Sequence, residues 1–142
     1  MNLSRHLHAG PIPACILSEQ TDKLSADLNA GAAACFIGRV RSDQTDGKTV
    51  VAIEYSAYPE MVESVVQLIK NQLLTSLSDL HAVEILHSTG LVKAGEASLL
   101  VVVSAGHRAE AFQALAKCVE LIKEHLPVWK KEHFQDGTFR WV

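Results

Sequence analysis

A lysine within an apolar helical stripe is the residue of this chain best placed for chemistry. Residues 109–126 predict an amphipathic helix. Its apolar stripe would contain Phe112, Ala116, Val119 and Leu126. At about 100° per residue, Lys123 falls almost directly above Phe112, within that stripe. Because a buried ammonium is costly unless paired, and burial lowers its pKa, we expect Lys123 to be functional. The alternative is that Lys123 lays its methylenes on the core and keeps its amine in solvent near the helix end.

Further cationic groups stand at both ends of this predicted helix. Gly106-His107-Arg108 precedes it, at the end whose free N–H groups and dipole attract anions. Lys130, Lys131 and Glu132 follow it. Individually these have ordinary alternatives: His107 could cap the helix, the lysines could be surface charge, and Glu132 could pair with one of them. Together they predict a site for a small anionic substrate.

A second pair of cations, Arg39 and Arg41, is predicted at the end of a strand over residues 32–41. Residues two apart on a strand project to one face, and paired arginines suit phosphate or carboxylate. The adjoining segment 42–47 is polar and turn-forming. The alternative is that the two arginines are solvated charges that finish the strand.

The composition limits the class of protein. The 142 residues predict one domain over 1–142, and 48% apolar with 20% charged residues is typical of a folded protein. A net charge of −3 argues against general nucleic-acid binding. The longest apolar run, residues 97–103, is too short to span a bilayer. The first residues lead into His6 and His8 rather than an apolar segment, so we expect no signal peptide.

The cysteines and histidines do not form a recognisable site. Three widely spaced cysteines in apolar surroundings, Cys15, Cys35 and Cys118, predict reduced core thiols in a cytoplasmic protein. The spacing of the histidines at 81, 87, 125 and 133 does not indicate a metal site, and we expect no metal and no cofactor. There is no glycine-rich nucleotide loop and no nucleophile motif. The expected catalysis is electrostatic positioning by lysines and arginines, with a lysine or histidine moving protons.

The hydrophobic patterns predict an α+β protein with a largely antiparallel sheet covered by two main helices. Predicted strands cover residues 11–17 (an edge strand), 32–41, 48–58, 81–88, 96–105 and 138–142. Predicted helices cover residues 21–28, 59–77 and 109–126. The polar segment 42–47 predicts a hairpin between its flanking strands, residues 90–95 a connection, and the stretch after residue 126 a loop. The strand 96–105 is apolar enough to be covered on both faces.

Taken in series, several motifs resemble the large, catalytic subunit family of molybdopterin synthase. They are Phe36-Ile37-Gly38-Arg39-Val40-Arg41, the stretch from Ile53 to Met61, Ser104 to Phe112, Leu121-Ile122-Lys123, Pro127 to Glu132 and Gly137 to Val142. The resemblance runs from about residue 31 to the C-terminus, in the family's order and spacing. Residues 1–30 add little to it.

The resemblance implies an α/β hammerhead fold and a sulfurtransferase reaction. The family converts cyclic pyranopterin monophosphate to molybdopterin, in molybdenum cofactor biosynthesis, by installing two dithiolene sulfurs. The sulfur donor is the C-terminal thiocarboxylate of a small ubiquitin-like subunit, whose Gly-Gly tail enters the large subunit. The family assembly is a large-subunit homodimer with one small subunit at each end, a heterotetramer.

The resemblance also carries roles to individual residues. Lys123 would lie beside the thiocarboxylate and assist sulfur transfer, and Lys130 would share the catalytic work. Lys130 and Arg41 would bind the substrate or the tail. His107 and Arg108, from the neighbouring protomer, would hold the pterin phosphate. The same motif positions place Arg39, Val40, Lys131 and Glu132 among the substrate-binding residues.

Two other classes of function compete with this hypothesis. One is a non-catalytic module that binds a ubiquitin-like Gly-Gly tail or a phosphorylated metabolite. The other is an enzyme of unrelated chemistry that binds a phosphate ester. The presence of all the cationic positions together, with Lys123 in an apolar stripe, favours the sulfurtransferase.

Overall fold

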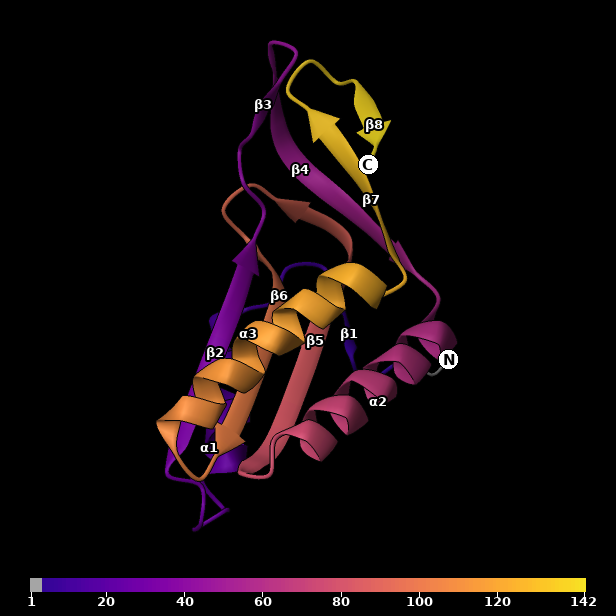
Figure 1. The fold of residues 1–142 in the computed structure, drawn as a ribbon. Helices are drawn as coiled ribbons and strands as arrows, with labels where there is room; N and C mark the ends of the chain where they lie inside the picture. The colour runs from indigo at the N-terminus through magenta and orange to yellow at the C-terminus, as the bar shows by residue number, and fades with distance from the viewer. Residues whose placement is uncertain (1–3) are drawn as a thin grey trace.

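The computed structural model describes residues 4–142, which form one mixed sheet with helices on both of its faces (Figure 1). The eight strands are β1 (Leu7–Ala9), β2 (Ala32–Arg39), β3 (Gln44–Thr45), β4 (Lys48–Ala57), β5 (Leu80–Lys93), β6 (Ala97–Ala105), β7 (Val128–Phe134) and β8 (Phe139–Trp141). The helices are α1 (Ala14–Leu24), α2 (Pro59–Ser76) and α3 (Arg108–His125). None of these helices is long and apolar enough to cross a membrane.

The sheet order is β2-β6-β5-β4-β7-β8, with β1 beside β5 and β3 beside β4. Only the short β1–β5 pair is parallel; every other pair is antiparallel. Strand β5 joins two parts of the molecule, because its first half pairs with β6 and its last residues pair with β4. Figure 1 shows the result: the helices cover the lower part of the sheet, and β3, β4, β7 and β8 extend beyond them. The predicted α+β class is confirmed.

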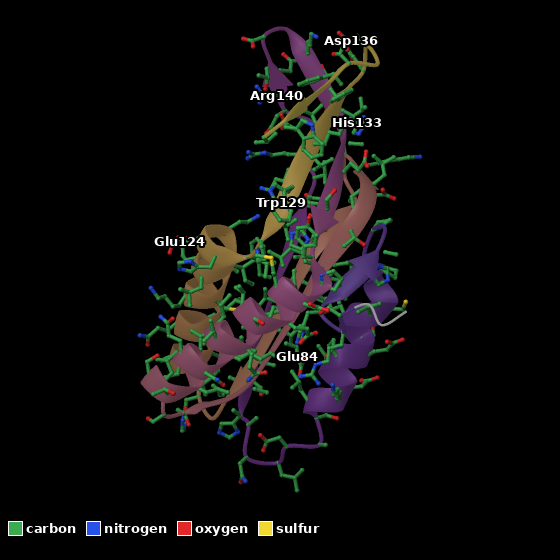
Figure 2. All side chains as sticks on the ribbon, turned by 90° about the vertical axis from the view of Figure 1, so that its right-hand side faces the viewer. Glu84, Glu124, Trp129, His133, Asp136 and Arg140 are labelled. Carbon is green, nitrogen blue, oxygen red and sulfur yellow. The ribbon has the colours of Figure 1, made fainter. Side chains whose placement is uncertain are left out.

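Helices α2 and α3 cover one face, as predicted, and bury the main core against β5 and β6. The apolar spacing of α2 places Val62, Val66, Ile69 and Leu73 on its buried side. Helix α1 lies on the opposite face, where Ile16, Leu17 and Leu24 pack with buried Ile12, Leu100 and Val102 (Figure 2). Strand β6 is therefore enclosed on both sides, and Ser98–Ala105 are all buried.

The predicted hairpin between residues 32–41 and 48–58 is wrong. Strand β2 pairs with β6, and β4 lies between β5 and β7. The turn-forming residues do make a turn, at Asp46 and Gly47 with φ of 52° and 75°, but it joins the short β3 to β4. The polar composition correctly located the turn. It did not identify the partner of β2, because pairing with β6 connects residues far apart in the chain.

Three element boundaries also differ from the predictions. Residues 11–17 are not a strand, because α1 begins at Ala14 after Pro13 and ends at Leu24, before much of the predicted helix 21–28. Ile16, Gln20 and Leu24 recur at helical spacing, but residues 11–17 alone are too few to show this repeat. Strand β5 continues through the predicted connection to Lys93, and the predicted loop after α3 contains β7. Pairing with β4 extends both segments, which are only partly apolar by themselves.

Candidate active site

Helix α3 does not bury the stripe that the sequence predicted. Its core-facing residues are Ala111, Ala114, Cys118, Leu121 and Ile122, whereas Phe112 is 65% exposed. Ala116 and Lys123 are also exposed, and Val119 is half-buried. The predicted stripe is therefore only partly covered: Phe112 and Ala116 are exposed, whereas Val119 and Leu126 pack against the edge of the core. The expectation that Lys123 lies inside the core of its own chain is wrong.

Lys123 is nevertheless in an unusual environment for an exposed lysine. Partial burial lowers the pKa of its ammonium, and the nearby cation Lys130 lowers this pKa further. Among residues 4–142, no carboxylate forms a salt bridge with either lysine. Two cations that approach each other without an acid form a site that prefers to receive an anion.

Helix α3 and strand β7 bring these two lysines together. Lys123 lies in the last turn of α3, and the chain turns at Leu126 and Pro127 into β7. Lys130 then lies opposite Tyr55 of β4 in the β4–β7 register. Figure 2 shows this junction, with Trp129 between the helix end marked by Glu124 and the extended strands that carry His133 and Arg140.

A buried histidine, His87 of β5, responds to both lysines. Burial, opposed by a hydrogen bond to Ser88 and reinforced by the charges of Lys123 and Lys130, lowers the pKa of His87 to about 4. The ring packs edge-on against Tyr55 at 5.0 Å between centroids, and the Tyr55 hydroxyl donates to Ser98 Oγ at 3.1 Å. Sequence analysis considered His87 only as a metal ligand. Its inward position between apolar residues of a strand was the available signal.

The predicted site residues that follow Lys130 have partners of their own. The Lys131 ammonium lies 3.9 Å from the ring centroid of Phe139 and 5.6 Å from that of Trp141. Glu132, for which pairing with a lysine was one alternative, instead accepts from Arg140 Nε at 2.7 Å. Both residues thus tie β7 to β8. Arg140 is a structural partner that sequence analysis missed.

The arginines at the end of β2 are separated rather than paired. Arg39 lines a cavity of about 470 Å³ with Pro13 and Leu17 on the α1 face of the sheet. Arg41 lies beyond the strand and forms a salt bridge with Asp43, Nε to Oδ1 at 2.9 Å. A register shift between Gly38 and Arg39 ends the regular alternation on which the prediction of a common face depended. Val40 between them is buried, and its backbone pairs with Glu96 and Gly95.

The N-terminal end of α3 is built differently. His107 is at the N-cap position, but its Nδ1 lies 3.0 Å from Asp79 Oδ2 instead of capping the helix. Glu110 accepts from the Asp79 backbone N–H at 2.7 Å. Gly106 leaves room for the Asp79 carboxylate, which a Cβ at this position would displace. Arg108 is exposed beside this cluster, so the predicted anion site has a guanidinium directed to solvent.

One protomer does not bring the two cationic ends of α3 together. Fifteen residues separate Arg108 from Lys123 along the helix, about 22 Å at the usual rise per residue. A phosphate held by His107 and Arg108 is therefore far from the Lys123 of the same chain. The predicted site is complete only if a second copy contributes one of its ends.

The cysteine predictions are partly wrong. Cys118 is buried, and burial raises the pKa of its thiol to about 12, which makes it unreactive. Cys15 and Cys35 are exposed, on α1 and on the outward-facing positions of β2. In residues 4–142, no group of three or more histidine, cysteine or acidic side chains is arranged to hold a metal ion.

The fold and the site define a class: a largely antiparallel α+β sheet with a partly desolvated lysine, Lys123, near a second lysine, Lys130, between its main helix and a β extension. Comparison with known proteins agrees. The family model described as MoaE protein matches residues 14–125. The molybdopterin synthase catalytic subunit of a Nostoc species is 39% identical over 124 residues, which cover 87% of this chain and 74% of that protein. The chain therefore belongs to the MoaE family.

Solved structures support the same fold. Molybdopterin synthase from Staphylococcus aureus superposes with a TM-score of 0.84 at 29% identity, over 96% of this chain and 95% of the other. A complex of subunits 1 and 2 of molybdopterin-converting factor from Helicobacter pylori contains a chain with a TM-score of 0.78. At 19% identity, covering 96% of this chain and 88% of that one, the second likeness shows the fold alone.

Proposed function

We propose that this protein is the catalytic subunit of a molybdopterin synthase. It would transfer sulfur from the C-terminal thiocarboxylate of a small ubiquitin-like subunit to cyclic pyranopterin monophosphate. The observation that carries the proposal is the Lys123–Lys130 pair, in which Lys123 is partly desolvated and neither lysine has an acidic partner among the described residues. Thiocarboxylate and phosphate are both anions, and such a pair favours their approach.

We assign each of these residues a proposed role from its position in the fold. Lys123, with its lowered pKa, would stabilise negative charge on the acyl oxygen or move a proton during transfer. Lys130 would hold the tail or the substrate beside it. Arg41, exposed beyond β2, is free to turn from Asp43 to an incoming anion. Val40 would support the arginines from the core rather than touch substrate.

The sulfur itself comes from the partner, because the chain's own thiols do not suit the task. Cys118 is buried and protonated, and the exposed Cys15 and Cys35 lie on α1 and β2. Each transfer would convert one thiocarboxylate into a carboxylate. A dithiolene has two sulfurs, so two carrier molecules would be consumed for each product.

A homodimer would complete the site, and α3 provides the surface for it. The stripe of exposed Phe112, exposed Ala116 and half-buried Val119 ends at Lys123. If two α3 helices packed antiparallel through these stripes, the stripes would be buried. His107 and Arg108 of one protomer would then lie beside Lys123 of the other. Arg108 and the exposed His107 would bind the substrate phosphate there, with Asp79 orienting the imidazole.

A product assay tests the reaction. The purified chain, the thiocarboxylated small subunit and cyclic pyranopterin monophosphate are combined, and mass spectrometry measures the dithiolene pterin. We expect product with wild type and with Lys117→Ala, an exposed lysine on the polar side of α3, but not with Lys123→Ala. A stable complex with the small subunit but no wild-type product would contradict the enzyme and support a non-catalytic binding module.

A measurement of mass in solution tests the assembly. Phe112→Asp places a carboxylate in the exposed stripe and should convert the dimer to a monomer in multi-angle light scattering. Gln113→Asp, one position away on the polar side, is the matched control and should leave the dimer intact. A monomeric wild type, or a dimer unaffected by Phe112→Asp, would contradict this arrangement.

A further inference from the structure

The cavity beside Arg39 lies on the α1 face of the sheet. It has a volume of about 470 Å³ and is formed where three segments meet: the start of α1, the end of β2, and the turn from β5 to β6. Small-molecule sites in proteins usually have volumes of about 300–1,000 Å³, so this cavity is large enough for a small ligand. Helix α3, which carries Lys123, packs on the opposite face of the sheet. The cavity is therefore separate from the candidate active site.

Most of the cavity wall is apolar. Leu100 of β6 and Ile12, which precedes α1, are buried side chains of this wall. Leu17 of α1 is half-buried, and Ile37 of β2 is exposed. Aliphatic side chains have no atoms that donate or accept hydrogen bonds, so this wall favours an aliphatic group of a ligand over a polar one.

The cavity has two charged residues, Arg39 and Glu96. Glu96 Oε1 accepts from the Lys93 backbone N–H at 2.8 Å, which holds this carboxylate at the turn between β5 and β6. Among residues 4–142, no carboxylate forms a salt bridge with Arg39, and this includes Glu96. An exposed guanidinium without a carboxylate partner can bind an incoming anion through its planar set of N–H groups.

The main chain around the cavity is already hydrogen-bonded. The N–H of Ile12 donates to the Ala97 carbonyl at 2.9 Å, and that of Val40 donates to the Glu96 carbonyl at 3.0 Å. The N–H of Gly95 in turn donates to the Val40 carbonyl at 2.8 Å. These bonds hold the three segments together, so the cavity is formed without a ligand. They also occupy main-chain groups that an extended peptide would need here, which favours a small free molecule.

We propose that this cavity is a second binding site, which takes a small aliphatic carboxylate. Arg39 binds the carboxylate, and the aliphatic part of the ligand lies against the apolar wall that includes Ile12 and Leu100. The sequence placed Arg39 among the substrate-binding residues, and this site gives it a ligand of its own on the face opposite Lys123. The site goes beyond the proposed sulfur transfer and does not depend on it.

Residue-resolved binding measurements test the site in the full chain, without substrate or partner. The probe is 4-methylpentanoate, for which we expect a Kd of about 1–10 mM from its size. In ¹H–¹⁵N spectra the amide signals of Leu17, Ile37 and Ala97 should shift and saturate. The uncharged 4-methylpentanamide, and acetate without the aliphatic body, should each bind at least about 5-fold more weakly. Equal binding of either control, or no saturable shift at these amides, would overturn the proposal.

Substitutions at the cavity test the role of the charge. Arg39→Gln should weaken the binding of 4-methylpentanoate at least about 5-fold and leave that of 4-methylpentanamide unchanged. Arg41→Gln, an exposed arginine outside the cavity wall, is the matched control and should bind both probes as wild type does. Ile37→Glu adds a carboxylate to the wall and should weaken binding of the acid further than Arg39→Gln. Binding of the acid that is unchanged in folded Arg39→Gln would overturn the proposal.

Two more measurements identify the site and the source of the ligand. Lys123→Gln should leave the probe shifts unchanged, and their loss would assign them to the lysine site instead. The peptide Ac-Gly-Leu ends in a similar aliphatic carboxylate and tests a chain end as the ligand. Tighter binding of this peptide than of 4-methylpentanoate would overturn the assignment to a small free acid. The product assay is independent of all these results, so the proposed function and this site can fail separately.

Discussion

The two ends of α3 both carry cations, but their surroundings differ. At the C-terminal end, the charge of Lys130 acts on Lys123, both lysines act on the buried His87, and partial burial lowers the pKa of Lys123. At the N-terminal end, His107 is held by Asp79 in an exposed cluster. The first arrangement is strained electrostatically, which suits a change of protonation or charge during a reaction. The second arrangement pairs a histidine with a carboxylate at an exposed position, which suits binding.

The largest effect should come from Lys123→Arg, which keeps the charge and removes the readily lost proton. A guanidinium does not deprotonate in proteins, so if Lys123 moves a proton, kcat should fall by about 10²–10⁴-fold. Product formation under single-turnover conditions measures this. Arg108→Lys is the counterpart at the other end and should mainly raise KM. Full activity of Lys123→Arg would mean that positive charge alone is sufficient, and the two ends would then work alike.

Complementation should show whether the two ends act across protomers. Lys123→Ala and the double variant His107→Ala/Arg108→Ala should each be inactive as homodimers. After unfolding and refolding together, a symmetric dimer allows one intact site in each mixed dimer, and activity should return to about one quarter of wild type. Wild-type chain refolded in the same way is the control. No recovery despite mixed dimers, detected by mass, would show that both ends serve the same chain.

The free energy of unfolding should rise slightly when the charge of Lys123 is removed. The pKa of Lys123 is lower in the folded protein than in the unfolded chain. Below the ordinary lysine pKa, protonation of this group therefore favours the unfolded chain and lowers the free energy of unfolding. Lys123→Met should therefore stabilise the fold at neutral pH, within the about 0.5 kcal/mol typical of surface substitutions. The gain should shrink as the pH rises toward 10.5, the ordinary lysine value. Urea unfolding at pH 7 and pH 10 measures it, and a loss of stability at pH 7 would contradict the expectation.

The smallest effect should come from Asp79→Asn at the N-terminal end. The hydrogen bond from His107 holds the pKa of Asp79 below its usual value of 3.8. The stability contributed by this carboxylate is present above that value and is lost as the pH falls through the lower, folded pKa. Wild type should thus be more stable than Asp79→Asn at pH 6, and the difference should disappear in strong acid. Thermal unfolding over this range checks the sign; an equal difference at all pH values would show that the charge of Asp79 is not involved.

The helices and the buried strand could be predicted because their signals are local. The apolar spacing of α2 reports its buried side directly, and the continuous apolar run of β6 reports burial on both faces. The β2–β6 pairing and strand β7 were missed for a common reason. Both depend on partners distant in sequence, and β7 is a partly polar segment that becomes a strand only beside β4.

In the candidate site too, local signals were predictable from the sequence, and surroundings that depend on distant segments were not. The importance of Lys123, Lys130, His107 and Arg108 was inferred from residue type and spacing. The stripe that drew attention to Lys123 was real, but periodicity alone does not say whether an apolar face meets its own core or remains uncovered. A place for His87 in the site could not be predicted, because nothing near it in the sequence indicates that the charges of two lysines act on it.

By itself, the sequence determined that this chain folds as an α+β protein, carries cations at both ends of one helix and resembles a single family. Those properties follow from periodicity, composition and motif order, all of which are local or additive along the chain. The tertiary structure decided which face of α3 is buried, that Arg39 and Arg41 separate, and that the charges of Lys123 and Lys130 act on buried His87. These outcomes depend on strand pairing and on desolvation, which arise only when distant segments come into contact.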